Sequence, residues 1–418
     1  MAKYIGTSFV DETGSPAGGI FSRDSGTCSV VVNDDIGNCA DGNCSTISGG
    51  QSNCASSIYS VVGGGCNNNS INQYSTVGGG LSNTASECRS TVGGGESNTA
   101  SGKLSSIGGG LSNTSNGYGA VVSGGVSNSS SAYYSTVSGG CSNVASGEYS
   151  TIGGGYNGTA GGDNSTISGG YTNCTVNLNS TVGGGFNNCA TGYSSTISGG
   201  YQNKATASNS TASGGYQNIA SSVFSTVSGG YSNVACAIYS AVGGGYDNTA
   251  SGSYSNVGGG YQNCSIGGCS VVSGGVSNRS TGVCSTVGGG YSNDSKGVNS
   301  TVGGGYNSTA CGDSSTVSGG FFNFSCGLQS TVSGGYINCA VGDNSVISGG
   351  QFNKAVCNLS GVFGGESNTV CDTHAFAIGS GISVAVGGAG SCSNCGSVLY
   401  VECICILNTA NGLNGGAV

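Results

Sequence analysis

Residues 231–245 read YSNVACAIYSAVGGG, and the same pattern begins again at Tyr246. In steps of fifteen residues, a Gly-Gly pair recurs 22 times without a break, from Gly49-Gly50 to Gly364-Gly365. A short period that never slips indicates one structural unit per repeat, stacked in a line. We number the repeat so that the Gly-Gly pair occupies positions 2 and 3.

Two patches of the repeat have the pattern of short strands. Position 15 is Val or Ile in 21 of 22 turns, position 13 is Ser in 21 of 22, and Thr is the commonest residue between them. Alternation with β-branched residues is typical of strands, so we expect positions 13 and 15 to face inward and position 14 outward. The second patch is Asn-x-Ala at positions 6 to 8. Its middle position tolerates Lys204, Arg279, Asp294 and Phe324, which indicates that Asn and Ala also face inward.

Position 6 is Asn in 20 of 22 turns, with Gly158 and Ser308 as the exceptions. A buried amide needs hydrogen-bond partners, and amides stacked in successive turns can bond from turn to turn. The sequence therefore predicts an Asn ladder. Its members include Asn53, Asn83, Asn98, Asn233, Asn248 and Asn263.

Together these columns predict an all-β fold, a parallel β-solenoid of about 23 stacked turns with two short strands in each turn. A Gly-Gly corner and a second corner, with Gly or Ser at position 10, join the strands. Residues 1–32 lack the pattern and are expected to form an N-terminal cap, 33–370 the solenoid, and 371–418 a C-terminal cap or assembly segment with a strand at 398–407. Gly contributes 87 of 418 residues, but its spacing excludes collagen, and the low content of charge and Pro argues against disorder.

Composition and charge also predict what the chain lacks. The net charge is −9 and the eight Lys and Arg residues are scattered singly, so we expect no binding of nucleic acid. We see no secretory signal in residues 1–16 and no apolar run of about 18 residues, so we expect no membrane insertion. The 17 carboxylates are dispersed and His374 is the single histidine, so we expect no enzyme activity, no metal and no cofactor.

Twenty-two cysteines are many for a reduced cytosolic protein. Four pairs share a column in consecutive turns, where stacked residues lie about 4.8 Å apart, within the Cα range of a disulfide. We predict that some of these pairs are disulfides between adjacent turns; the alternative is that Cys is one more small residue tolerated there. For the C-x-x-C pair Cys392 and Cys395 we predict a disulfide, with no bond, or zinc bound together with Cys403 and Cys405, as alternatives. The stacked pairs are Cys39/Cys54, Cys174/Cys189, Cys269/Cys284 and Cys311/Cys326.

Position 4 is aromatic in 12 of the 13 turns from Tyr156 to Tyr336, and Val276 is the exception. One interpretation is a stack of rings along the outer face of the chain itself. The other is a contact surface, either a seam between chains or a strip that binds sugars, because exposed aromatic rows mark contact surfaces. The candidate contact residues are Tyr201, Tyr216, Tyr231, Tyr246 and Tyr261.

Two C-terminal motifs resemble a known family. Ser383–Gly387 (SVAVG) looks like the Ser-Val-Ala-Ile-Gly signature of the YadA-like head repeats of trimeric autotransporter adhesins, and Ala375–Gly379 (AFAIG) is similar. Over residues 33–390, approximately, the resemblance lies in the repeat period and the general pattern of the repeat. It implies a left-handed parallel β-roll in a three-chain bundle that binds surfaces or matrix. The fifteen-residue period is longer than that family favours, and similar repeats in fibre-like proteins of phages and large DNA viruses fit better.

The function we predict is a structural fibre or filament protein, located outside a cell or on a virion surface. It would self-associate as a homotrimer or a filament and serve in attachment or assembly, with surface glycans or matrix as further partners. One alternative is an ice-binding solenoid that uses the Thr column at position 14. Another is a carbohydrate-binding tail-fibre shaft that uses the aromatic row. Against ice binding, the Thr column is interrupted at Val61, Val121, Ala241, Asn256 and Gly361.

Overall fold

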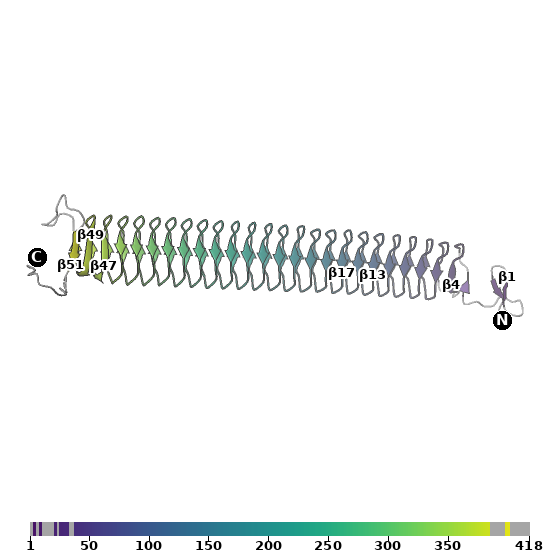
Figure 1. The fold of residues 1–418 in the computed structure, drawn as a ribbon. Coiled ribbons are helices and arrows are strands. Elements are labelled where there is room, and N and C mark those ends of the chain that lie inside the picture. Colours follow the sequence, from purple (N-terminus) through teal and green to yellow (C-terminus); the bar gives the residue numbers. More distant parts are fainter. Residues whose placement is uncertain are drawn as a thin grey trace, which may run out of the picture. The chain divides into compact units, whose positions relative to one another are not determined.

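The structure is a computed structural model that describes residues 25–32 and 37–384, together with the backbone of short strands at 3–5, 8–10, 21–22 and 398–401. Within these residues the regular secondary structure is all β. The chain divides into two compact units, Met1–Asn233 and Val234–Val418. Within each unit the short strands stack in successive turns (Figure 1).

Each unit is a parallel β-solenoid with fifteen residues in a turn, as predicted, and the two units together contain about 23 turns. Odd-numbered strands cover positions 14 and 15, from β5 (Thr46–Ile47) to β29 (Thr226–Val227) in the first unit and from β31 (Ala241–Val242) to β45 (Val346–Ile347) in the second. Even-numbered strands cover positions 7 and 8, from β6 (Cys54–Ala55) to β28 (Ile219–Ala220) and from β30 (Val234–Ala235) to β48 (Thr369–Val370). Within a unit each strand pairs in parallel with the strand one turn further on, as β17 (Thr136–Val137) does with β19 (Thr151–Ile152).

The core of a turn is small. It consists of the Val or Ile at position 15, the Ala or Ser at position 8, the Asn at position 6 and the Ser at position 13, all of them buried. Positions 7 and 14 lie on the outer side of the strands, as the alternation predicted. Because few apolar side chains are buried in each turn, hydrogen bonds between turns must contribute much of the stability.

The Gly-Gly corner needs glycine for two reasons. At position 3, Gly50 has a φ of 84°, and a Cβ there would lie 2.0 Å from the carbonyl oxygen of Gly65 and 2.8 Å from Nδ2 of Asn53. At position 2, a Cβ on Gly64 would make only an ordinary contact, 3.8 Å from the carbonyl oxygen of Gly49, but its φ of 144° is one that L side chains rarely adopt. The corner therefore combines close approach with unusual backbone geometry.

Two further corner positions adopt the left-handed conformation without glycine, which the sequence analysis did not predict. Position 5 has φ values such as 54° at Ser52, and position 12 has values such as 57° at Tyr59. Even the β-branched residues Thr172 and Ile337 take φ 54° at position 5. This conformation is unfavourable for such residues, so the surrounding ladder must hold them in it.

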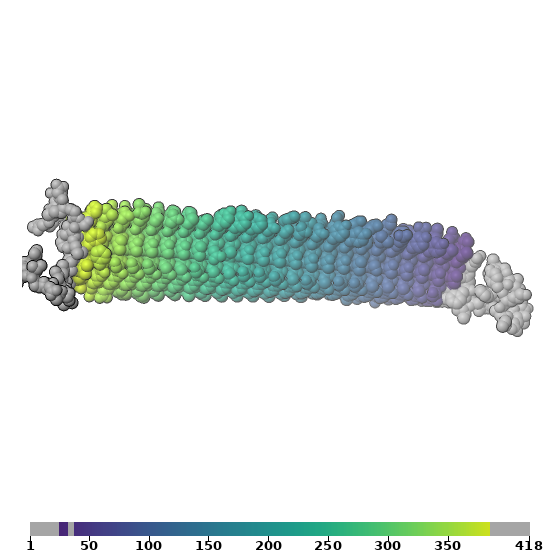
Figure 2. Space-filling view, in the orientation of Figure 1, coloured from purple at the N-terminus to yellow at the C-terminus, as the bar shows by residue number. Residues whose placement is uncertain are grey.

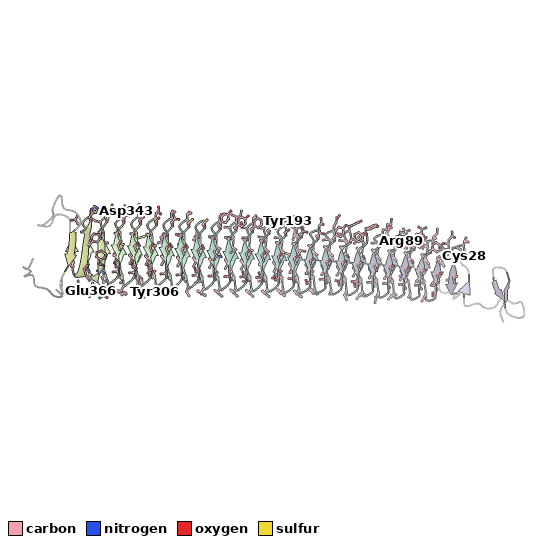
Figure 3. The ribbon with its side chains drawn as sticks, viewed as in Figure 1. Cys28, Arg89, Tyr193, Tyr306, Asp343 and Glu366 are labelled. Carbon is pink, nitrogen blue, oxygen red and sulfur yellow. A yellow bond between two sulfur atoms is a disulfide. The ribbon has the colours of Figure 1, made fainter. Side chains whose placement is uncertain are left out.

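The two corners form opposite edges of a unit. In the second unit, Asp343 at position 11 lies on one edge, and Tyr306 and Glu366 at position 4 lie on the other (Figure 3). Because successive turns superpose, side chains of one column form straight rows on the surface of each unit (Figure 2). Each exposed column is therefore a continuous surface feature of its unit.

The regular pattern changes near both ends. At the N-terminal end, β1 (Lys3–Ile5) pairs antiparallel with β2 (Ser8–Val10), and β3 (Phe21–Ser22) pairs antiparallel with β4 (Val30–Val32). β4 pairs in parallel with β5, so the parallel sheet begins before residue 33.

At the C-terminal end, parallel pairing continues past residue 370 through β47 (Gly361–Glu366), β49 (Ala375–Ser380) and β50 (Ser383–Val384), with a shift of register between Val362 and Gly365. β51 (Val398–Val401) occupies the first part of the predicted strand 398–407 and pairs in parallel with β49. The rest of that predicted strand lies outside the described residues.

Candidate functional site

The Asn at position 6 joins each turn to the next. Oδ1 of Asn203 accepts from the backbone N–H of Asn218 at 2.9 Å. Its Nδ2 donates to the carbonyl oxygens of Gly199 and Gly215, both at 2.9 Å. One side chain thus fixes the Gly-Gly corner of its own turn to the corner of the following turn. The six predicted members Asn53, Asn83, Asn98, Asn233, Asn248 and Asn263 are all fully buried.

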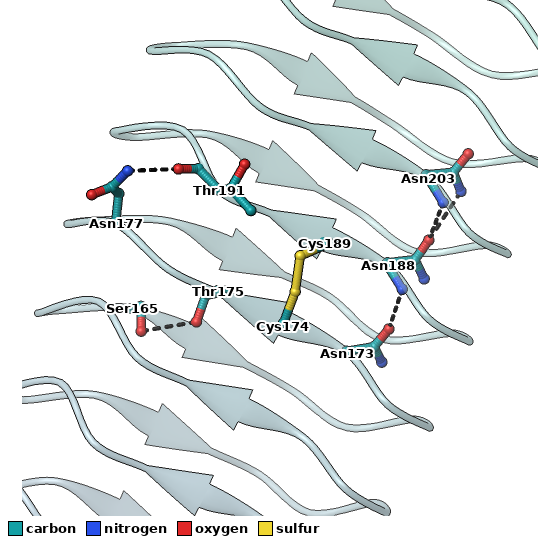
Figure 4. The surroundings of a disulfide bond; sticks show 9 residues. All are labelled: Ser165, Asn173, Cys174, Thr175, Asn177, Asn188, Cys189, Thr191 and Asn203. Atoms are coloured by element: carbon teal, nitrogen blue, oxygen red, sulfur yellow. Dashed lines mark hydrogen bonds between the residues drawn. A yellow bond between two sulfur atoms is a disulfide. The ribbon is translucent and has the colours of Figure 1, made fainter.

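The partners of this ladder differ from those expected. We expected amide-to-amide bonds, but most contacts join an amide to the backbone. Direct bonds between amides occur in some turns, such as Nδ2 of Asn203 to Oδ1 of Asn188 at 3.2 Å (Figure 4). The backbone partners are more effective, because they satisfy carbonyl groups that the glycine corner leaves inside the coil.

The two exceptions weaken the ladder locally. At Gly158 the backbone N–H still donates to Oδ1 of Asn143 at 2.8 Å, but no side chain bonds the next turn. At Ser308 the hydroxyl accepts from the N–H of Asn323 at 3.3 Å, longer than the 2.9 Å typical of the Asn bonds. A hydroxyl also has fewer donors than an amide.

The aromatic column at position 4 is a stack of rings on one edge of each unit. In the first unit, rings from Tyr156 to Tyr231 follow one another with centroids 4.7–5.0 Å apart and interplanar angles of 1–12°. In the second unit, Tyr246 stacks on Tyr261, and a separate run extends from Tyr291 to Tyr336. Of the candidate contact residues Tyr201, Tyr216, Tyr231, Tyr246 and Tyr261, all but the half-buried Tyr216 are exposed. The ring faces cover one another, so the surface presents mainly ring edges and hydroxyls.

A second aromatic row at positions 11 and 12 was missed by sequence reasoning. Tyr59 stacks on Tyr74 with a centroid distance of 5.2 Å, and Tyr239 stacks on Tyr254 at 5.0 Å. Tyr193 marks the edge that carries this row in the first unit (Figure 3). The spacing of fifteen between these tyrosines was the available signal, but the column also contains Asn, Ser, Cys and Leu, which dilute it.

Two of the four stacked cysteine pairs form disulfides. Cys174–Cys189 joins β22 (Cys174–Thr175) to β24 (Cys189–Ala190) across adjacent turns (Figure 4). Cys311–Cys326 joins two other adjacent turns, at position 9. The pairs Cys39/Cys54 and Cys269/Cys284 are thiols in the structure, and Cys392 and Cys395 lie outside the described residues.

The two cysteines of the first thiol pair interact with each other and with nearby polar side chains. Sγ of Cys39 lies 2.7 Å from Oδ2 of Asp41, and Sγ of Cys54 lies 3.1 Å from Oγ of Ser56. Burial, the bond to Asp41 and the neighbouring Cys54 raise the pKa of the Cys39 thiol to about 12. Cys39 is therefore protonated near neutral pH and is a poor nucleophile.

Contacts between charged side chains are sparse among the described residues; one is the ion pair between Nζ of Lys296 and Oδ2 of Asp294, at 3.5 Å. In the part of the chain that the structure describes, no group of three or more potential ligands could hold a metal ion, and no helix is long and apolar enough to span a membrane. His374 is exposed on a corner.

No protein-family model and no curated protein sequence matches the chain.

Proposed function

We propose that this chain is a structural fibre or filament protein, without catalytic activity, that acts outside a cell or on a virion surface. The uniformity of its turns supports this proposal. From residue 48 to residue 362, successive turns bury the same four positions, and the same pattern of backbone hydrogen bonds recurs from turn to turn. Repeated bonding of this kind makes a rigid coil, which suits reach and support better than the moving parts of an enzyme.

The exposed side chains at position 4 are the observation that supports self-association. In the first unit this column is apolar or aromatic in every turn from Leu111 to Tyr231, and most of its side chains are exposed. Soluble monomers rarely expose a contiguous apolar surface of this kind. Copies of the chain that pack along the column, as a homotrimer or within a filament, would bury it.

Mass photometry with negative-stain electron microscopy tests this proposal. We expect the wild-type protein to have the mass of three chains or more, and a Tyr201→Ser/Tyr216→Ser/Tyr231→Ser variant to dissociate towards single chains. The matched control replaces Tyr59, Tyr74 and Tyr149 of the other row by Ser and should keep the wild-type mass. A wild-type protein that stays a single chain at every concentration would contradict the proposal.

Attachment to surface glycans or matrix is the finer part of the proposal. The stacked rings do not favour a sugar-binding strip along the whole column, because sugars bind aromatic rings through the ring face and these faces are covered. Any attachment site is therefore expected at the interrupted parts of the column or at the ends of the chain. A glycan array, read with wild type and the triple Ser variant, measures whether the column contributes.

Ice binding is a second candidate because the Thr column has one long regular run. Seven threonines from Thr136 to Thr226 lie in register on successive parallel strands, each half-exposed. A regular row of methyl and hydroxyl groups is the feature that such a function requires. Measurement of thermal hysteresis decides, and freezing behaviour equal to that of a buffer control would exclude it.

A further inference from the structure

The aromatic stack of the second unit lacks one ring, at Val276. Tyr261 has its stacked partner in Tyr246 at a centroid distance of 5.1 Å, and Tyr291 has its partner in Tyr306 at 5.0 Å. Val276 lies between them, in β-bridges with both Tyr261 and Tyr291. One face of each ring is therefore turned towards the short side chain of a valine.

The spacing of the neighbouring rings indicates how much room this gap leaves. Elsewhere in the same unit, two residues of position 4 that lie two turns apart hold a ring between them. Tyr306 sits in this way between Tyr291 and Phe321, with centroid distances of 5.0 and 4.6 Å. Tyr261 and Tyr291 are also two turns apart, so the same thickness is available between their rings.

The gap is open to solvent. Tyr261 is 44% exposed and Tyr291 is 46% exposed, while Val276 is half-buried. A valine side chain ends near the base of a neighbouring tyrosine ring, so Val276 forms a floor and leaves the outer part of the gap unfilled. The walls and the floor carry no charge. A guest that fits is neutral, flat and one ring thick.

We propose that the gap between Tyr261 and Tyr291 is a binding site for a single planar aromatic ring, such as the ring of a small phenolic or indolic molecule. The guest would complete the stack and contact a ring face on each side, and such contacts are favourable in offset-stacked geometry. The seam between chains was argued for the position-4 column of the first unit, whereas this site uses residues of the second unit alone.

Saturation-transfer NMR with p-cresol and with indole tests the site. We expect both probes to bind wild-type protein, with upfield shifts of their ring protons caused by the two flanking rings. Val276→Tyr supplies the missing ring and should weaken binding on the order of tenfold, as loss of two ring contacts predicts. Val276→Ala lowers the floor and should retain binding. Tyr is the residue of the neighbouring turns at this position, so Val276→Tyr should fold.

A transplanted gap makes the test independent of that variant. Tyr201 stacks between Phe186 and Tyr216 at 4.8 Å on each side, so Tyr201→Val should create a second site and add one bound probe per chain. Equal binding by wild type and Val276→Tyr, or no binding of either probe to wild type, would overturn the proposal. Binding of methyl glucoside in preference to both aromatic probes would overturn it as well.

Discussion

At the residue scale, the asparagine at position 6 links each turn that contains it to the next turn. Its three hydrogen bonds satisfy two carbonyl groups of the glycine corners and one backbone N–H, in a coil too thin to hold a large apolar core. The sequence was sufficient to predict that this residue is buried and bonds from turn to turn. It could not identify the backbone partners, because these depend on the path of the glycine corner.

The break at Ser308 offers a test of the ladder. Ser308→Asn should restore the donors to the corner carbonyls and a bond of normal length to the N–H of Asn323. We expect an increase of about 1–3 kcal/mol in the free energy of unfolding. Thermal melting and amide exchange at Asn323 measure the effect. Ser308→Ala is the control and should destabilise slightly; equal melting of the Asn and Ala variants would show that the ladder contributes little.

The left-handed corners show a limit of sequence reasoning at the same scale. Position 5 contains Ser, Asn, Gln, Thr, Phe and Ile in different turns, so no single residue type marks its φ near 55°. Asn tolerates this conformation best among non-glycine residues, and β-branched residues tolerate it least. The conformation is imposed by the ladder on either side and is not chosen by the residue.

Two adjacent turns provide a matched pair for this effect. Thr172 and Asn187 occupy position 5 with φ 54° each. Thr172→Asn should raise the free energy of unfolding by about 1 kcal/mol, and Asn187→Thr should lower it by a similar amount. Thermal melting of both variants and of the double exchange measures the effect. Stability changes of the same sign in the two single variants would refute a conformational cause.

At the scale of the element, strands of two residues depend on their neighbours. Strand pairs were predictable because Ser-Thr-Val and Asn-x-Ala recur without a slip. The continuation to β50 was not, because the strand register shifts between Val362 and Gly365 and the fifteen-residue sequence pattern ends after residue 370. The sequence also could not predict that Cys39 and Cys54 remain thiols, because the column spacing brings two sulfurs near each other but does not fix their side-chain torsions.

The disulfide between β22 and β24 should stabilise these short elements. Closing a loop of about fifteen residues restricts the unfolded chain by about 3 kcal/mol. Reductant should therefore lower the melting temperature of wild-type protein. It should not change the melting temperature of a variant in which both disulfides are removed by replacing Cys174, Cys189, Cys311 and Cys326 with Ser. Replacement of Cys39 and Cys54 by Ser is the control and should leave the response to reductant unchanged. Full alkylation of Cys174 and Cys189 without reductant would contradict the bond.

At the scale of the whole molecule, the chain is a sum of nearly equivalent turns, each of which contacts its neighbours alone within a unit. Stability in such a protein comes from individual turns and from the interfaces between them. The columns thus matter more than the identity of any one turn. This accounts for the variety of residues at positions 4, 7 and 12 beside the near-constant positions 2, 3, 6, 13 and 15.

Deletion of a complete turn tests this view of the molecule. Removal of residues 111–125 joins Gly110 to Val126 and keeps every column in register, so the protein should fold and melt within a few degrees of wild type. Removal of residues 111–118 joins Gly110 to Gly119 and places a position-12 residue where position 4 belongs. This shorter deletion should cause a loss of parallel pairing and rapid cleavage by thermolysin near the junction. Circular dichroism and limited proteolysis of both proteins compare the outcomes. If the eight-residue deletion were tolerated as well as the fifteen-residue one, column register would not be what holds the coil together, and the hydrogen bonds of the Asn ladder could not be the link between turns.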